Sequence, residues 1–181
     1  MEENMFGEDM YEELNEMQVR LDAGESAMGN VPLVRHLNKV LANTTSVALE
    51  AHGFHWNVKG PDFAQYHALF DSIYEAVDGS IDDIAESILR LGFDSPFHMS
   101  ELMGMRTIHE SNPTDTPQAM ATELLHLIDT LVVDANEGFE IASAVEQQGV
   151  ADMFAGLIFD LQKWAWQLRA SIGAQLPNRI R

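Results

Sequence analysis

The sequence predicts an all-α protein, a bundle of four long helices with a long crossover between the second and the third. Apolar residues recur every three or four positions in four long runs, and no run shows the strict alternation of a strand. Three of the six prolines and one glycine lie in one stretch near the middle of the chain. With 181 residues, 46% of them hydrophobic, the chain is long enough for one core and one domain.

Two long amphipathic helices are expected before the crossover. The first follows Pro32 and ends at the turn 57–61, which contains Gly60 and Pro61. The second covers Phe63–Leu91, with Asp62 as its expected amino-terminal cap and Gly92 as its stop.

The crossover covers Phe93–Pro117, which holds Gly104 and three prolines, and a short helix is expected at Met99–Met105. Two further periodic runs, Gln118–Gln148 and Val150–Leu176, are separated by Gly149. Four long helices with one long crossover in the middle form the layout of a ferritin-like bundle rather than of a simple up-down bundle.

Both ends of the chain lie outside the predicted bundle, which is assigned to residues 31–176. Residues 1–30 are interpreted as an acidic extension, because the first 25 residues hold nine acidic side chains and one arginine, a net −8. A short helix is expected at Tyr11–Leu21, separated from the bundle by Ala23–Pro32. Residues 177–181 form a short tail.

The composition excludes several classes of function. The 29 acidic and 10 basic residues give a formal charge of −19, which repels phosphate backbones and anionic lipids and favours cations. The chain has no cysteine, so a metal site must use histidine and carboxylate ligands. Neither a signal peptide nor an apolar window of about 20 residues is found, so a cytoplasmic protein without a membrane partner is expected.

The second predicted helix carries an acidic stripe beside its apolar face. Between Pro61 and Leu89 there is no lysine or arginine, although like charges four residues apart cost a few tenths of a kcal/mol each. A solvated acidic surface is the ordinary interpretation of such a stripe, and a bound cation is the alternative that would relieve the repulsion. At about 100° per residue, the stripe contains His67, Asp71, Glu75, Asp78, Asp82 and Glu86.

Spacing along this helix predicts a site shared between two chains. His67 with Asp71, and Asp82 with Glu86, are pairs four residues apart that could each hold a metal ion. His67 and Asp82 are 15 residues apart, or about 22 Å along a helix, so the two pairs cannot bind one ion within one chain. Two copies packed antiparallel across a two-fold axis would form the complete site twice. His55 and Trp56, at the end of the first helix, add an imidazole and an indole near His67.

The segment HGFHWNVKGPDFAQYHALFDSIYEAVDGSIDDIAESILRLG, residues 52–92, resembles the signature region of the Dps family, the DNA-binding proteins from starved cells or mini-ferritins. The similarity lies in H-W-N-V-K-G-P-x-F, in the Y-H-x-x-F-D pattern and in D-x-I-A-E-x-I-x-x-L-G. The family's subunit, four helices with a crossover between the second and third, also fits residues 31–176. The resemblance does not cover residues 1–30.

The resemblance implies a ferroxidase centre between two-fold-related subunits. It assigns His55, His67 and Asp71 from one chain and Asp82 and Glu86 from the other as ligands of two irons, with Trp56 beside them as a scavenging residue or a core aromatic. It also implies a dodecameric shell that oxidises Fe(II), commonly with hydrogen peroxide or else with oxygen, stores Fe(III) as mineral and protects against oxidative stress. Zinc is a competing occupant, because affinity follows ligand type.

Three interpretations stay open alongside this one. Asp152 matches an acidic position of the family's iron-entry pores, or it is an ordinary acid near a helix amino terminus. Glu123 and His126 have the spacing of an intra-subunit di-iron site, which lacks its other ligands here. The alternative function is a nucleoid-associated, DNA-protecting shell whose metal site holds zinc or is inactive. The acidic extension argues against that alternative, and direct DNA binding is not expected.

Overall fold

The computed structural model describes residues 5–110 and 116–173, with side chains from residue 28 onward, and within them it contains five α-helices and no strand. This confirms the all-α class and the short helix in the crossover. None of these helices is long and apolar enough to cross a membrane. The helices are α1 (Met5–Asn57), α2 (Phe63–Arg90), α3 (Met99–Met105), α4 (Pro117–Ala144) and α5 (Gln148–Ser171).

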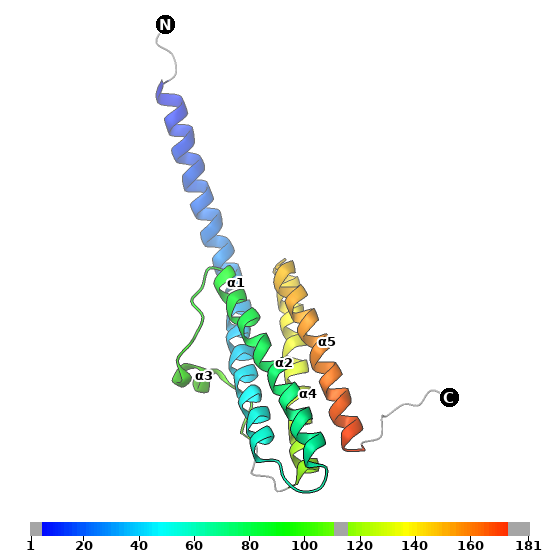
Figure 1. Ribbon diagram of the computed structural model, residues 1–181. Helices are drawn as coiled ribbons and strands as arrows, with labels where there is room; N and C mark the ends of the chain where they lie inside the picture. Colours follow the sequence, from blue (N-terminus) through cyan, green and yellow to red (C-terminus); the bar gives the residue numbers. More distant parts are fainter. Residues whose placement is uncertain (1–4, 111–115, 174–181) are drawn as a thin grey trace, which may run out of the picture.

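The four long helices form two hairpins that share one core (Figure 1). Helix α1 packs along α2, α4 packs along α5, and the contact between α1 and α4 joins the two pairs. Each long helix contributes side chains that are at most 2% exposed, among them Leu37, Phe70, Leu124 and Leu161. The crossover carries α3, which lies along the outside of α1. The chain then enters α4, which also packs against α1.

Helix α1 is continuous, so the expected break at Ala23–Pro32 is wrong. Pro32 lies inside the helix and cannot donate to the carbonyl of Met28, a residue that is exposed. The side chain of Asn30 is buried, and its Oδ1 accepts a hydrogen bond from Gln147 Nε2 at 3.3 Å. The helix therefore runs through the proline, and its first part projects beyond the bundle (Figure 1).

The turn between α4 and α5 lies at Val145–Gln147, so Gly149 is not the separator that the sequence suggested. Glu146 takes a left-handed conformation with φ 57°, and Gln147 N donates to Ala142 O at 2.9 Å. These features define a Schellman-type helix end, in which glycine is usual but not required. Because Gln147 also contacts Asn30, a tertiary contact helps to fix the turn.

The carboxyl end of α2 is as the sequence predicted, whereas its amino-terminal cap differs from the prediction. Gly92 has φ 86° and terminates the helix, with Phe93 N donating to Ile88 O at 3.3 Å. Asp62 occupies the N-cap position, but it has φ 60° and its side chain makes no capping hydrogen bond. The tight turn that returns the chain imposes this left-handed conformation, which differs from the extended backbone of an ordinary cap.

A polar cluster joins α1, α4 and the crossover. The buried Asn43 donates to Asp134 Oδ2 at 2.7 Å and accepts from Thr107 N at 2.8 Å. Lys39 Nζ lies 3.0 Å from Asp134 Oδ1 and 2.9 Å from Glu137 Oε2. Burial lowers the pKa of Lys39, but its hydrogen bonds to Glu137 and Asp134 outweigh that effect and raise it. The hydrogen bond from Lys39 holds the pKa of Glu137 below its ordinary value.

Replacing Gly138 with alanine should destabilise the bundle. A Cβ at this position would lie 2.3 Å from Cζ of Phe154, whose ring is fully buried. Overpacking of this kind costs about 1–3 kcal/mol, more than alanine gains as a helix former. Gly156→Ala is the matched control on α5, because its Cβ would meet nothing within 4 Å. Thermal unfolding of the assembled protein should show a lower midpoint for G138A alone.

Replacing Glu137 with glutamine should lower stability at neutral pH and leave it unchanged in acid. The side chain is 55% exposed, so the ion pair with Lys39 contributes about 0.2–1 kcal/mol. Because the pKa of Glu137 is lowered in the folded state, its contribution is complete above the ordinary carboxyl pKa and is lost as the pH falls through the folded value.

Urea unfolding of wild type and E137Q from pH 7 to pH 3 measures this difference. Glu140→Gln, an exposed acid on the same helix, is the control. A difference between wild type and E137Q that persists undiminished at pH 3 would contradict the assignment.

Candidate metal centre

The end of α1 and the start of α2 are brought together by the turn 58–62. Val58 is buried and its N donates to Phe54 O at 2.9 Å, which closes the last turn of α1. Gly60 has φ 101°, a conformation that side chains rarely adopt, and its carbonyl accepts from Phe63 N at 3.3 Å. The chain therefore reverses within a few residues and lays His67 against His55.

His55 and His67 form a reciprocal pair across the two helices. Their rings stack with centroids 3.9 Å apart and an interplanar angle of 17°. His55 Nδ1 lies 3.0 Å from His67 O, and His67 Nδ1 lies 2.8 Å from His55 O. A carbonyl only accepts hydrogen bonds, so each Nδ1 carries a proton, and in the neutral form of the ring each Nε2 keeps a lone pair for a metal. Metal-binding histidines are held in this way, with the second nitrogen donating to a backbone carbonyl.

Asp71 joins this pair from the next turn of α2. Its Oδ1 lies 3.5 Å from His55 Nδ1, and its side chain is 47% exposed. Phe63 stacks on His67 with centroids 4.9 Å apart. The structure thus brings His55, His67 and Asp71 together at a position that solvent can reach.

Asp82 and Glu86 lie further along α2, away from this group. At 1.5 Å per residue, Asp82 is about 22 Å from His67, and both acids are exposed. Glu86 makes an ion pair with Arg90 one turn later. Across residues 28–110 and 116–173, no group of three or more histidine or acidic side chains within the chain has a geometry that could hold a metal ion. Glu123 and His126 lie within these ranges and are not part of any such group.

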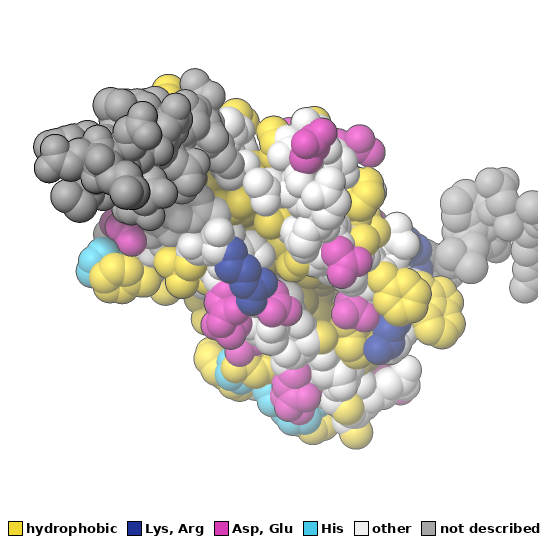
Figure 2. Space-filling model, turned by 90° about the horizontal axis from the view of Figure 1, so that it is seen from above, with side chains coloured by type: hydrophobic (Ala, Val, Ile, Leu, Met, Phe, Trp, Pro, Cys, Tyr) yellow, Lys and Arg dark blue, Asp and Glu magenta, His cyan; other side chains and the backbone are white. Residues whose placement is uncertain are grey.

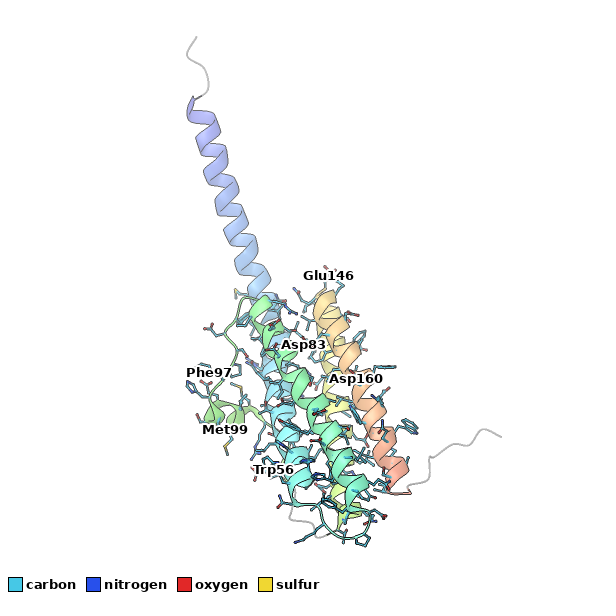
Figure 3. All side chains as sticks on the ribbon, in the orientation of Figure 1. Trp56, Asp83, Phe97, Met99, Glu146 and Asp160 are labelled. Carbon is cyan, nitrogen blue, oxygen red and sulfur yellow. The ribbon has the colours of Figure 1, made fainter. Side chains whose placement is uncertain are left out.

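Trp56 is not part of the subunit's core, because its side chain is 60% exposed. Figure 3 labels it near the carboxyl end of α1. Its indole contacts the His52 ring at a centroid distance of 4.1 Å. The interpretation of Trp56 as a core aromatic is therefore wrong for the single subunit.

Asp152 lies in a different place, on the first turns of α5. It is exposed and lines a groove of about 390 Å³ between α2 and α5, together with Asp83, Asp160 and Arg90. Figure 3 labels Asp83 and Asp160 on the two helices that border this groove. Acidic side chains also outnumber basic ones on the visible part of the face in Figure 2. Asp152 is not close to the histidine pair in this chain.

Sequence reasoning missed two residues beside the centre, His52 and Tyr74. The His52 ring stacks on Tyr74 with centroids 3.7 Å apart and an interplanar angle of 11°. The H-x-x-H spacing of residues 52 and 55 was the available signal, because it places both imidazoles on one side of α1. Arg90 was missed as well, since it lies just beyond the stretch without basic residues.

Comparison with known proteins shows the family to which the chain belongs. The ferritin-like domain family matches residues 34–175. DNA protection during starvation protein 2 of Bacillus anthracis is 32% identical over 78% of this chain and 97% of its own length. The Dps protein of Vibrio cholerae O1, described as a ferritin-like diiron-carboxylate protein, has a TM-score of 0.77 at 25% identity over 81% of this chain and 92% of its own. Dps from Staphylococcus aureus has a TM-score of 0.75 at 26% identity over 79% and 96%. The chain therefore belongs to the ferritin-like family and, within it, to the Dps proteins.

Proposed function

We propose that this protein oxidises Fe(II) at two-iron sites shared between two subunits and stores the Fe(III) as mineral inside a hollow shell of twelve subunits. The observation that carries the proposal is the His55–His67 pair, whose Nε2 lone pairs are left free by the reciprocal hydrogen bonds. Membership of the Dps proteins supports it. The expectation of a cytoplasmic location stays a prediction.

One chain supplies two incomplete ligand sets to these sites. His55, His67 and Asp71 form the first set, and Asp82 and Glu86 form the second, about 22 Å away. An antiparallel pair of α2 helices across a two-fold axis places the first set of each subunit against the second set of the other. Such a dimer has two complete sites.

The ligand chemistry suits iron as a substrate. Carboxylates hold Fe(III), imidazole tolerates Fe(II), and the absence of cysteine removes competing thiol oxidation. Two Fe(II) ions lose one electron each, and one hydrogen peroxide accepts both electrons together with protons to give water. Hydrogen peroxide is the proposed oxidant, with oxygen as the alternative. Zinc binds the same ligand types and is proposed as a competing occupant.

Two further residues have proposed roles around this chemistry. Trp56 is exposed beside His52 and His55, where its indole can take up stray oxidising equivalents. Asp152, with Asp83 and Asp160 in the groove between α2 and α5, offers carboxylates along a path for iron ions. Neither Trp56 nor Asp152 is proposed as a ligand of the two-iron site.

Direct DNA protection by binding is the second candidate, because several relatives carry that name. The chain's charge opposes it. A net −19 on each subunit repels phosphate, and the two arginines at 179 and 181 lie outside the described residues. We propose that any protection of DNA comes from removal of Fe(II) and peroxide.

Mixing two inactive variants should restore part of the activity. His67→Ala removes the first ligand set and Asp82→Ala the second, so each pure variant should lose rapid oxidation. In a mixed dimer one of the two sites combines both intact sets. Random mixing in equal amounts should therefore recover about a quarter of the wild-type rate. The measurement is Fe(III) absorbance after peroxide addition to anaerobically loaded protein.

Asp78→Ala is the matched control for this experiment, because Asp78 is an exposed acid on the same helix that is not a proposed ligand. It should oxidise iron at the wild-type rate. No recovery after verified subunit exchange would argue against a shared site. Absence of rapid oxidation in the wild type would refute the proposed function itself.

Plasmid DNA should not be retarded by the protein at about 150 mM salt in the presence of a chelator. The reason is repulsion between the acidic shell and the phosphates. An electrophoretic shift assay tests this, with a parallel lane containing magnesium to detect bridging by divalent ions. A clear shift in the chelator lane would contradict the prediction.

A further inference from the structure

His52 lies beside the candidate metal centre and is in contact with two other aromatic rings. Its ring stacks face to face on Tyr74 of α2, 3.7 Å away, and its ring centroid is 4.1 Å from that of Trp56. The centroid of His55 lies 5.9 Å away. His52 therefore touches two aromatic rings and borders one proposed iron ligand.

Two stacked ring pairs connect α1 to α2 in this region. His55 with His67 is the first pair and His52 with Tyr74 the second, with centroids 3.9 and 3.7 Å apart. On α1 the pairs are about one turn apart, and on α2 about two turns. Asp71 lies between them on α2. The spacing of the two helices is thus fixed on both sides of this carboxylate.

Tyr74 gives the second pair a firm base. Its side chain is half-buried and packs against the hydrophobic core, and His52 is half-buried as well. A ring stacked on an anchored ring loses rotational freedom, so His52 has a defined position. Trp56 is 60% exposed. Among the described residues, the aromatic ring that its indole contacts is His52. His52 therefore transmits the fixed position of Tyr74 to Trp56.

We propose that His52 is a positioning residue, whose stacking between Tyr74 and Trp56 holds the His55–His67 pair, Asp71 and the indole in the geometry needed to bind metal. The proposal rests on the function proposed above and adds to it a residue that is not itself a ligand. It assigns the effect to the flat ring of His52 and not to its nitrogen atoms.

Two substitutions at position 52 separate these possibilities. His52→Phe keeps a flat ring that can stack on Tyr74, and His52→Ala removes it. Anaerobic Co(II) binding to the full-length assembled protein, followed by visible absorption, measures the site without any oxidation step. H52A should bind Co(II) about tenfold more weakly, the scale seen when residues behind a metal ligand are lost, and H52F should match the wild type.

A second pair of variants tests the other ring. Tyr74→Phe should resemble the wild type, and Tyr74→Ala should reproduce the weakened binding of H52A. His126→Ala, an exposed histidine on α4, is the control for loss of an imidazole as such. Circular dichroism and oligomer size establish that each variant is folded and assembled.

The outcomes are distinct. Wild-type affinity in H52A would overturn the proposal, and equal losses in H52A and H52F would overturn it in favour of a role for the imidazole nitrogens. If the wild type neither binds Co(II) nor oxidises Fe(II), the proposed function fails.

The stacking role is then tested on metal-free protein by acrylamide quenching of fluorescence. The signal of Trp56 is the difference between each protein and the same protein carrying Trp56→Phe. Its quenching should rise in H52A and not in H52F. No rise in H52A would overturn the stacking role as well.

Discussion

The structure around the candidate centre depends on the crossing of two imidazoles between the end of α1 and the start of α2. Each ring donates Nδ1–H to the other's backbone carbonyl, and the two rings stack. Hydrogen bonds and stacking together fix the tautomer, the ring planes and the separation of the helices. Contacts within the chain thereby orient the two imidazoles, which reduces the entropy cost of binding a metal ion.

The tight turn makes this crossing possible. Gly60 adopts a left-handed conformation and Val58 is buried, so α2 starts close to the point where α1 ends. A longer loop would separate His55 from His67 and leave each imidazole to solvent. Further from the turn, the Asn43 and Lys39 contacts with Asp134 tie α1 to α4. The bundle thus holds α1 in place along its length while one end of it contributes to the centre.

Two copies of the acidic helix α2 repel one another where they meet, so the proposed dimer needs a cation between them. Asp82 and Glu86 remain on an exposed face, and within the chain only Glu86 gains a basic neighbour, Arg90, among the described ion pairs. The proposed ligand sets at the two ends of α2 are too far apart to meet within one chain. In the proposed dimer, a two-fold partner would bring imidazoles and a shared cation to Asp82 and Glu86.

The sequence by itself determined the helical class, the four long helices, the crossover with its short helix, and Gly92 as the end of α2. These features follow from local periodicity and from residues whose conformational preferences act locally. It also predicted that His55, His67 and Asp71 would be neighbours, because a short turn between two amphipathic helices leaves few other arrangements.

Only the tertiary structure decided the rest. Helix α1 runs through Pro32, where Asn30 meets Gln147 of the turn between α4 and α5, and the same contact helps to place that turn at Glu146 instead of Gly149. His52 stacks on Tyr74, a residue 22 positions later in the chain. Contacts between residues distant in sequence leave no local pattern, so periodicity and spacing could not reveal them.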